Sequence, residues 1–422
     1  MSTKTPDLRP AADLPSRGAA LRILYVHPFG TYGGATKSLS QMVAALPPGS
    51  VDGTAITPPG AASEALRAAG LKTIHVSGIA QWDDTRFGHY RGLRWLILLR
   101  ELAYWPATLS AISSAARSGR FDLIHCNEVT ALLPALLAKR RLRAPLVVHV
   151  RSLQRAEQGG RVSGWLMARL RSGADAVVAI DEAVRRTLPA DLPVSVIHNG
   201  MRVTGESPPR TVDRPFCVAI IGVLHRAKGV YEFVEAARIL RDRGVQVRLL
   251  VVGENIRTLS GARGWLLRKL DFARDVRGEL EDYVAKHRLE EVVQFTGFVA
   301  DIGSVYDQAD AVCFPSHLDA PGRPVFEAAL FALPTIVAMR NPTNDVIVPG
   351  ETGLCIDAPS PEAIAKAIQV LAEDRPRARS MGERARQLAV GRFESGRTAQ
   401  KMLALYRRLC PAADGAPASP TP

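Results

Sequence analysis

The sequence predicts an α/β protein with two doubly wound domains, each built on a parallel sheet. Short apolar runs rich in β-branched residues alternate with segments of helical periodicity, which is typical of parallel strands covered on both faces. This pattern occurs twice and is interrupted by a polar stretch containing Pro and Gly at 201–215. The 422 residues also suit two domains of about two hundred residues each.

Strands are predicted in order along both halves of the chain. The first half has apolar runs at 21–27, 52–57, 71–76, 121–126, 145–150, 175–180 and 193–197, with helical segments such as 34–46, 61–69 and 129–140 between them. The second half has runs at 216–222, 245–253, 292–297, 310–315 and 333–338. Strands that alternate with helices in this way form βαβ units and therefore a parallel sheet. The long basic segment between Gly253 and Glu279 predicts a helical insertion.

The domain boundaries follow from composition. Residues 1–20 and 411–422 are rich in Pro, Ala and Ser and are expected to be disordered tails. We expect an N-terminal domain at 21–205, a linker at 206–215, a C-terminal domain at 216–394 and a closing helix at 395–410 that packs back on the N-terminal domain. Because ligands of open α/β sheets bind at the carboxyl ends of the strands, the expected site lies in a cleft between the domains.

The charge and the cysteines limit the class of protein. A net charge of +13 favours an acidic partner, but the Arg residues are scattered and no nucleic-acid-binding motif is present, so no nucleic acid is expected. The five cysteines lie far apart, mostly in strand-like runs, which indicates reduced thiols: Cys126, Cys217, Cys313, Cys355 and Cys410. No signal peptide is recognisable, and no apolar stretch reaches the ~20 residues of a membrane span. We expect a cytoplasmic protein, soluble or peripheral on the inner face of the membrane.

Each half opens with a strand that runs into a glycine-containing loop and a helix. In the first loop, HPFGTYGGATKS, Gly33 and Gly34 would let backbone N–H groups approach a phosphate at a helix N-terminus, unless they only serve a tight turn with positive φ. In the second, GVLHRAKG at 222–229, Lys228 starts a helix, where a cation is unfavourable unless an anion lies nearby. Lys228 could neutralise a leaving diphosphate with help from Arg226, or both could be solvated.

Two carboxylates form the most informative segment, DAPGRPVFEAAL. Glu327 falls in an apolar helix, where a carboxylate is costly unless hydrogen-bonded, and ribose hydroxyls would satisfy it. Asp319 could accept hydrogen bonds from sugar hydroxyls. The alternative for Glu327 is a helix-initiating charge.

His149 lies near the end of the predicted strand at 145–150 and Arg151 follows it, so both are expected to face the cleft, where they could contact a bound sugar or a phosphate. A histidine in an apolar strand is more often a buried core residue. The other histidines have no ligand spacing, so we expect neither a metal site nor another cofactor.

An amphipathic helix is predicted at 91–106, where Trp95 and Arg100 lie among leucines. We favour a helix that packs on the first domain. The alternative is contact with an anionic membrane surface.

The order of motifs resembles the family 4 glycosyltransferases of the GT-B fold. These motifs are the GGA loop, NG in VIHNGM, GxLxxxKG, TGFV, ADAVCFPS, a carboxylate (Asp319) separated from Glu327 by seven residues, and PGETGL, in the family's order across 21–390. The resemblance implies two Rossmann-like domains facing across a cleft, and retaining, metal-independent transfer from a nucleotide-diphosphate sugar.

The resemblance also implies residue roles. Lys228 would neutralise the diphosphate, Glu327 would bind the ribose, Asp319 would face the donor sugar, and Phe298 would lie near the base. The residues expected to bind the donor are Gly33, Gly34, Asn199, Gly222, Arg226, Lys228, Phe298, Asp319, Arg323, Val325 and Glu327. The residues expected at the reaction centre are Lys228, Asp319, Glu327, His149 and Arg151.

The sequence departs from the family pattern at several positions. Val223 stands where the family usually has Arg, which removes a charge-assisted contact to the diphosphate unless another arginine substitutes. Asp319 replaces Glu, Arg151 stands where a histidine is often found, and Asn341 to Asp345 replace a GG-x-P-E segment.

The expected function is hexosyl transfer from a UDP- or GDP-linked sugar to a lipid-linked or polysaccharide acceptor in cell-surface glycan synthesis. One alternative is a non-catalytic relative that binds a nucleotide or a partner. The other is a nucleotide-sugar epimerase, which would need an acid/base pair around the sugar ring that the sequence does not display.

Overall fold

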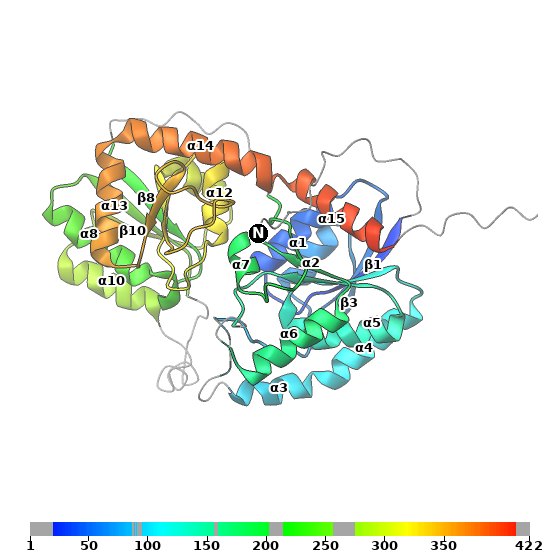
Figure 1. Cartoon of the computed structure of the whole chain (residues 1–422). Coiled ribbons are helices and arrows are strands. Elements are labelled where there is room, and N and C mark those ends of the chain that lie inside the picture. The colour runs from blue at the N-terminus through cyan, green and yellow to red at the C-terminus, as the bar shows by residue number, and fades with distance from the viewer. Residues whose placement is uncertain are drawn as a thin grey trace, which may run out of the picture.

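The computed structural model describes residues 20–86, 88, 90, 95–155, 159–201, 214–255 and 275–410. It contains two parallel sheets flanked by helices, as the sequence predicts (Figure 1). The seven-stranded sheet has the order β3-β2-β1-β4-β5-β6-β7, and the six-stranded sheet has the order β10-β9-β8-β11-β12-β13. Both are doubly wound, because the strand order reverses on either side of the first strand of each sheet. We call the parts built on them the N-terminal and C-terminal domains.

The strands of the N-terminal domain lie where the apolar runs predict them. They are β1 (Leu21–Val26), β2 (Val51–Thr57), β3 (Lys72–His75), β4 (Leu123–Cys126), β5 (Leu146–Val150), β6 (Ala176–Ala179) and β7 (Val194–Val196). β1, β4 and β5 at the centre of the sheet are almost entirely buried, since helices cover both faces. Continuous burial explains why these strands read as apolar runs rather than as alternating patterns.

Helices from distant parts of the chain cover this sheet. One face carries α4 (Trp105–Arg117), α5 (Leu132–Leu142) and α6 (Arg161–Gly173). The other carries α1 (Gly34–Ala44), α2 (Ala61–Ala68) and α15 (Ser395–Leu409), the last helix of the chain. Two short helices, η2 (Val129–Ala131) and α7 (Glu182–Arg186), follow β4 and β6. In α15, Met402, Leu405 and Tyr406 are buried in the same cluster as Leu39 of α1.

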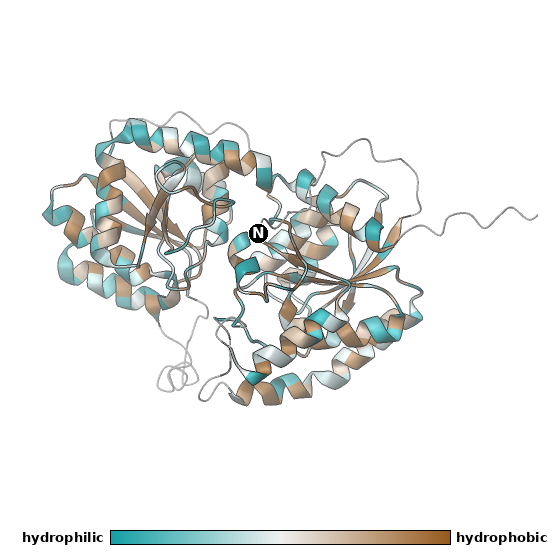
Figure 2. Ribbon diagram, viewed as in Figure 1, coloured by the Kyte–Doolittle hydropathy of each residue, from teal (hydrophilic) through white to brown (hydrophobic). Residues whose placement is uncertain are grey.

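The C-terminal domain repeats the arrangement. Its strands are β8 (Phe216–Ile221), β9 (Val247–Val252), β10 (Val293–Gly297), β11 (Ala311–Phe314), β12 (Thr335–Ala338) and β13 (Gly353–Ile356). Its helices are η4 (Arg226–Lys228), α8 (Val230–Asp242), α10 (Val276–His287), α11 (Gly303–Gln308), α12 (Arg323–Leu330), α13 (Pro361–Glu373) and α14 (Arg375–Phe393). In Figure 2 the strands of both sheets are mainly hydrophobic, whereas hydrophilic residues lie on the outer helices.

The chain crosses between the domains at two adjacent segments. The backbone N–H of Met201 donates to the carbonyl oxygen of Phe393 (2.8 Å), and the N–H of Ser395 donates to that of Met201 (2.9 Å). The Glu394 carboxylate caps α15 by accepting from the N–H groups of Gly396 and Arg397. The predicted tails, the linker at 206–213 and most of the predicted insertion, 256–274, lie outside the described residues.

The structure corrects the prediction of one continuous helix at 91–106. The described part contains α3 (Ile97–Ala103) and α4, which meet at Tyr104. Pro106 occupies the first turn of α4, where its missing N–H costs no hydrogen bond, so a new helix starts there. α3 packs on the first domain through Glu101, whose buried carboxylate accepts from the N–H of Gln81 (2.9 Å), while the side chains of Leu99 and Leu102 on its outer face are exposed.

Candidate functional site

The loop after β8 holds Lys228 at the carboxyl end of the C-terminal sheet. His225 Nδ1 accepts from the N–H of Ala227 (3.1 Å), which starts the η4 turn. Gly229 has φ +74, and a Cβ there would lie 1.9 Å from the carbonyl oxygen of Pro315. Glycine is therefore required, because the loop passes against the chain that follows β11.

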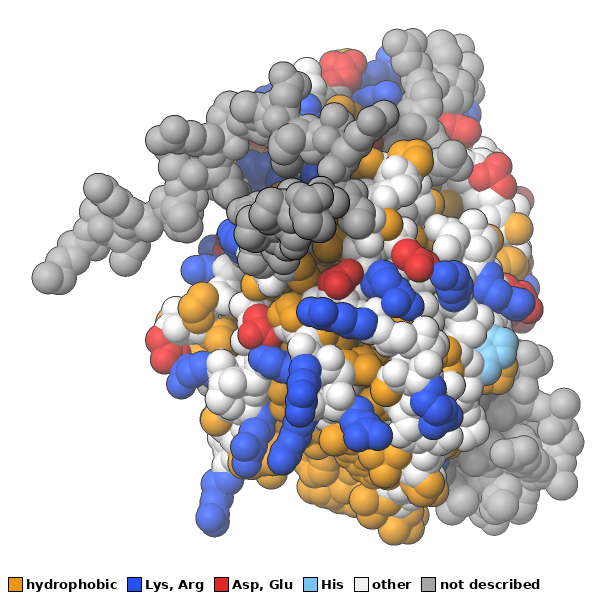
Figure 3. Space-filling model, turned by 90° about the vertical axis from the view of Figure 1, so that its right-hand side faces the viewer, with side chains coloured by type: hydrophobic (Ala, Val, Ile, Leu, Met, Phe, Trp, Pro, Cys, Tyr) orange, Lys and Arg blue, Asp and Glu red, His pale blue; other side chains and the backbone are white. Residues whose placement is uncertain are grey.

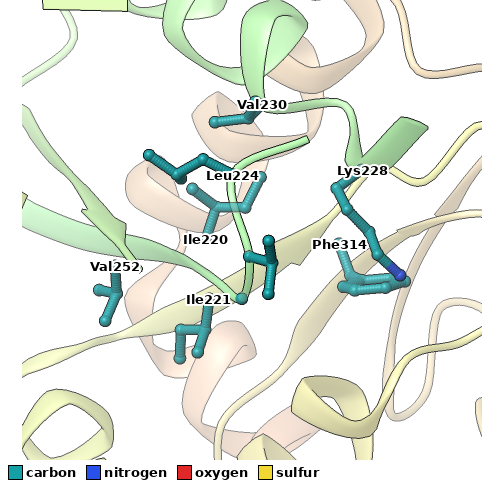
Figure 4. A pocket seen from close by; sticks show the side chains of 9 residues that line it. Ile220, Ile221, Leu224, Lys228, Val230, Val252 and Phe314 are labelled. Atoms are coloured by element: carbon teal, nitrogen blue, oxygen red, sulfur yellow. The ribbon is translucent and has the colours of Figure 1, made fainter. Parts of the chain in front are cut away.

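The ammonium of Lys228 is enclosed without a counter-ion. Its Nζ lies 5.1 Å from the centre of the Phe314 ring, and Gly222, Val223 and Leu224 line the same small pocket (Figure 4). Within the described residues Lys228 forms no ion pair, and burial lowers the pKa of its ammonium. A partly buried cation without a negative partner favours binding of an anion.

The N-terminus of α12 lies against the same phenylalanine. A Cβ at Gly322, the N-cap of α12, would lie 2.2 Å from the Phe314 ring, so only glycine fits there. The N-terminus of α12 and the ammonium of Lys228 therefore flank one aromatic ring. Helix N-termini attract phosphate groups, and an adjacent cation strengthens that preference.

Glu327 lies in α12 and receives hydrogen bonds from both domains. Its Oε1 accepts from Lys37 Nζ of α1 (2.6 Å) and from Arg323 Nε (2.8 Å), and its Oε2 accepts from the Tyr306 hydroxyl (2.9 Å). Burial opposes ionisation, but the charges of Arg323 and Lys37 and the hydrogen bonds from Lys37 and Tyr306 lower the pKa of Glu327 below its usual value. Glu327 is thus an ionised acceptor at the junction of the domains.

Arg323 extends this junction. Its two terminal nitrogens donate to Ser38 Oγ (2.8 Å) and to Gln41 Oε1 (2.6 Å), both on α1. α1 and α12 therefore face each other across the domains. The side chain of Val325, another expected donor contact, is buried in the apolar cluster with Phe314.

Other expected donor contacts lie apart from this network. Asp319 is exposed at φ +53, and its Oδ1 accepts from the N–H of Arg340 (2.9 Å). Phe298 is exposed, and the Arg226 guanidinium lies 5.9 Å from the ring centre of Tyr231 on α8. In the described structure, no hydrogen bond or ion pair joins Asp319, Phe298 or Arg226 to Lys228 or Glu327.

The glycines of the first loop are not needed for a strained turn, which corrects that interpretation. Gly33 is the N-cap of α1 with φ −111, and neither Gly33 nor Gly34 has positive φ. A Cβ at either position would meet no atom within 4 Å. The protein itself therefore leaves this space open, which is compatible with close approach by a ligand.

Arg151 is held at the end of β5 by neutral groups. Its guanidinium donates to the carbonyl (2.9 Å) and the side-chain oxygen of Asn127, to Asn199 Oδ1 (2.6 Å) and to His149 Nδ1 (3.2 Å). Asn199 thus positions Arg151. Burial, then the charge of Arg151, lowers the pKa of His149 well below its usual value, so this imidazole is neutral.

The surroundings of Arg151 are buried and polar. His27 and His125 are fully enclosed, and burial, then the charge of Arg151, lowers the pKa of each to about 3. Burial raises the pKa of Glu128, which follows β4, to about 7. His149 is only 3% exposed, which fits the core interpretation for its ring, whereas Arg151 is partly exposed.

Sequence reasoning missed Lys37 and Tyr306. Lys37 lies in the quoted GGATKS segment, on the first turn of a helix, where a cation opposes the dipole. The same argument singled out Lys228 and could have identified Lys37. No local signal identifies Tyr306, because its hydroxyl reaches Glu327 only through packing of α11 against the sheet.

Comparisons with known proteins agree with the fold and assign the family. The model of the glycosyl transferase 4-like domain matches residues 33–200, and that of glycosyl transferases group 1 matches residues 207–388. The chain is 23% identical over 313 residues to a glycogen synthase of Mycobacterium tuberculosis (69% of this chain, 70% of the relative). It is 26% identical over 361 residues to a D-inositol 3-phosphate glycosyltransferase of Kineococcus radiotolerans (76% and 79%).

Solved structures share the two-domain architecture. The structure of Anabaena HepE in complex with UDP-glucose is similar with a TM-score of 0.70 at 21% identity. The match covers 92% of this chain and 100% of the HepE chain. Sucrose-phosphate synthase from Thermosynechococcus elongatus has a TM-score of 0.68 at 20% identity, covering 92% and 99%. Because the two family models together match most of the chain and the fold is shared, the chain belongs to the glycosyltransferases of family 4, with the GT-B fold.

Proposed function

We propose that this glycosyltransferase transfers a hexose from a UDP- or GDP-linked sugar to a lipid-linked or polysaccharide acceptor in cell-surface glycan synthesis. The observation that carries the proposal is the ammonium of Lys228, which lies beside the N-terminus of α12 without a counter-ion among the described residues. A diphosphate would supply the missing negative charge. The UDP-glucose complex of Anabaena HepE supports a donor of this class.

The roles of the site residues follow from their chemistry. Lys228 stabilises the charge that develops on the leaving diphosphate, a contribution of about 10²–10³ in rate for one positioned group. Glu327 is ionised and accepts hydrogen bonds from the ribose hydroxyls. Arg151, a fixed cation at the cleft side of β5, contacts the reacting sugar or an acceptor phosphate.

In this proposal the sugar is transferred with retention of configuration at its anomeric carbon. The retention rests on the family resemblance. Comparing the anomeric configuration of donor and product by NMR tests it. An inverted product would contradict retention while leaving the transferase assignment intact.

The transferase proposal is tested by incubating the protein with UDP- and GDP-sugars and measuring donor consumption with and without glycan or lipid-linked acceptors. Glu327→Ala removes the proposed ribose acceptor, and Glu327→Gln keeps its size while removing its charge. Glu351→Gln, at an exposed glutamate, is the matched control. Unchanged turnover in both Glu327 variants would overturn the site assignment.

The same assay separates the alternatives. A non-catalytic relative, which the valine at 223 favours, would bind nucleotide but consume no donor. An epimerase would convert the donor sugar without any acceptor. Transfer that requires an acceptor would exclude both.

We also propose peripheral contact with an anionic membrane through α3. Its outer face carries Leu99 and Leu102, both more than 60% exposed, and the exposed side chains of Trp95 and Leu96 directly precede it. α3 and α4 form the lower edge of the N-terminal domain in Figure 1, and hydrophobic side chains gather at the lower edge of the end face in Figure 3, below several Lys and Arg side chains.

The charge around this face fits anionic lipids. The helices on this side of the sheet carry the basic residues Arg100, Arg117, Lys139, Arg140, Arg141, Arg161, Arg169 and Arg171, of which Arg100, Lys139 and Arg171 form ion pairs with Glu101, Asp175 and Asp191. Their one carboxylate, Glu101, is buried. Each basic residue near an anionic surface adds about 1 kcal/mol to binding. Within the described residues, no helix combines the length and the apolarity that a bilayer crossing requires.

A further inference from the structure

The junction between α1 and α12 contains more positive than negative charge. Lys37 and Arg323 both pair with Glu327, at 2.6 and 2.8 Å, and each of these side chains is largely buried. Among the described residues, neither cation has a second carboxylate partner. Two cations therefore share one carboxylate at the junction where the donor is proposed to bind.

The two cations differ in how firmly they are held. Arg323 also donates to Ser38 and Gln41, so its planar guanidinium is fixed in three directions. Lys37 has a flexible stem, and in the described structure Glu327 is the one hydrogen-bond partner of its ammonium. Lys37 is thus the cation that can change partner at least cost.

Three donors already occupy the carboxylate of Glu327, which offers about four acceptor sites, so two ribose hydroxyls cannot both bind without displacing one of them. Its Oε1 accepts from both cations, and its Oε2 accepts from the Tyr306 hydroxyl. A pair of ribose hydroxyls at Glu327 must compete with these donors. Lys37 shares Oε1 with Arg323, so its displacement leaves the carboxylate still ionised and still paired with a cation.

We propose that Lys37 exchanges partners when the donor binds: the ribose takes its place on Glu327, and its ammonium moves to the diphosphate. This inference rests on the proposed function and adds a phosphate-binding residue from the N-terminal domain. Lys37 lies on the first turn of α1, and its N–H donates to the carbonyl of Gly33 (2.9 Å), at the start of the open glycine loop. It supplies the positive charge that Val223 lacks.

Partner exchange predicts opposite effects on two ligands. In Lys37→Met the competitor for Glu327 is gone, so a nucleoside without phosphates binds as tightly as to the wild type, or more tightly. A nucleoside diphosphate loses one charge-assisted contact and binds about tenfold or more weakly. If Lys37 had a purely structural role, Lys37→Met would weaken the binding of both ligands together.

The experiment measures dissociation constants of UDP and GDP by calorimetry, and those of uridine and guanosine by competition. Lys72→Met is the matched control, because Lys72 forms an exposed ion pair with Asp52 on β2. Lys37→Arg keeps the positive charge, so its affinity for the nucleoside diphosphate should be close to that of the wild type. The circular dichroism of each variant checks folding.

The outcomes separate this inference from the proposed function. A selective loss of diphosphate affinity in Lys37→Met, absent in Lys72→Met, supports partner exchange. Equal affinities in wild type and Lys37→Met, or tighter binding of both ligands, would overturn it and leave the proposed function standing. Failure of the wild type to bind any nucleoside diphosphate would overturn both.

Discussion

His198 Nε2 lies 2.9 Å from Asp345 Oδ2, which joins the segment after β7 to the loop after β12. The same Asp345 oxygen accepts from the backbone N–H of Glu182 at the start of α7 (3.0 Å). Burial opposes ionisation of Asp345, but the hydrogen bonds from His198 and Glu182 lower its pKa. The domains therefore meet at a second polar contact besides α1 and α12, and the segment that departs from the family pattern, Asn341 to Asp345, supplies it.

Alanine at the first glycine loop should separate ligand binding from stability. Gly33→Ala and Gly34→Ala place a methyl group in open space without backbone strain, so the free energy of unfolding should change by no more than about 1 kcal/mol. The KM for the donor should rise, because the methyl group blocks backbone approach to the phosphate. Denaturant unfolding and donor kinetics measure the two effects.

Gly229→Ala is the contrasting variant. Its φ of +74 and the close Pro315 carbonyl should make it lose about 1 kcal/mol of stability or more. If Gly33→Ala and Gly34→Ala destabilised the fold to the same extent, a structural role for the first loop would be indicated instead.

Glu128 should make stability depend on pH. Burial raises its pKa to about 7 in the folded protein, although Val129, Arg151 and Ser152 donate hydrogen bonds to it. Its contribution to stability is therefore fully present below the unfolded pKa of about 4.3 and is lost as the pH rises through about 7.

Glu128→Gln stays neutral, so its stability relative to the wild type should increase by about 1–3 kcal/mol between pH 5 and pH 9. Denaturant titrations of both proteins across this range measure the difference. A difference that is independent of pH would show that Glu128 titrates near its ordinary value.

A charge on the outer face of α3 should weaken membrane contact. Leu99→Glu and Leu102→Glu place carboxylates among exposed leucines, where burial in the lipid interface is costly, so co-sedimentation with phosphatidylglycerol vesicles should fall several-fold. Val390→Glu, at an exposed valine of α14, should leave it unchanged. The proposed surface would be excluded if the wild type sedimented equally with zwitterionic and anionic vesicles, or if it sedimented with neither.

Arginine at position 223 should strengthen donor binding. Val223 is half-exposed at the pocket that contains Lys228, so Val223→Arg adds a cation without displacing core atoms. The affinity for nucleoside diphosphates should increase about tenfold, and the same change should rescue Lys37→Met. An affinity unchanged in both backgrounds would indicate that position 223 does not face the diphosphate.

The sequence predicts the fold because each central strand is an uninterrupted apolar run. The run at 145–150 corresponds to β5 (Leu146–Val150), whose side chains are all buried. β13 (Gly353–Ile356) escapes prediction, since it is short, begins with glycine and is only half-buried. Local pattern identifies strands through burial and therefore fails at a short edge strand.

The candidate site is predicted less completely. Lys228 and Glu327 carry local signals, a cation at a helix start and a carboxylate in an apolar helix. Their partners do not: Lys37 lies 290 residues from Glu327, and the two meet only after both domains fold and dock. A contact of this kind depends on tertiary geometry, which no local spacing encodes.

The most direct test of the donor site is thermal stabilisation by nucleoside diphosphates and their sugars. A ligand at 100 times its Kd adds about 2.7 kcal/mol to the folded state. We predict that UDP- or GDP-sugars raise the melting temperature of the wild type selectively, and that Lys228→Met abolishes the shift while Lys72→Met, at an exposed ion pair with Asp52, retains it. A folded wild type that no nucleotide stabilises, or an equal shift in Lys228→Met, would contradict the account.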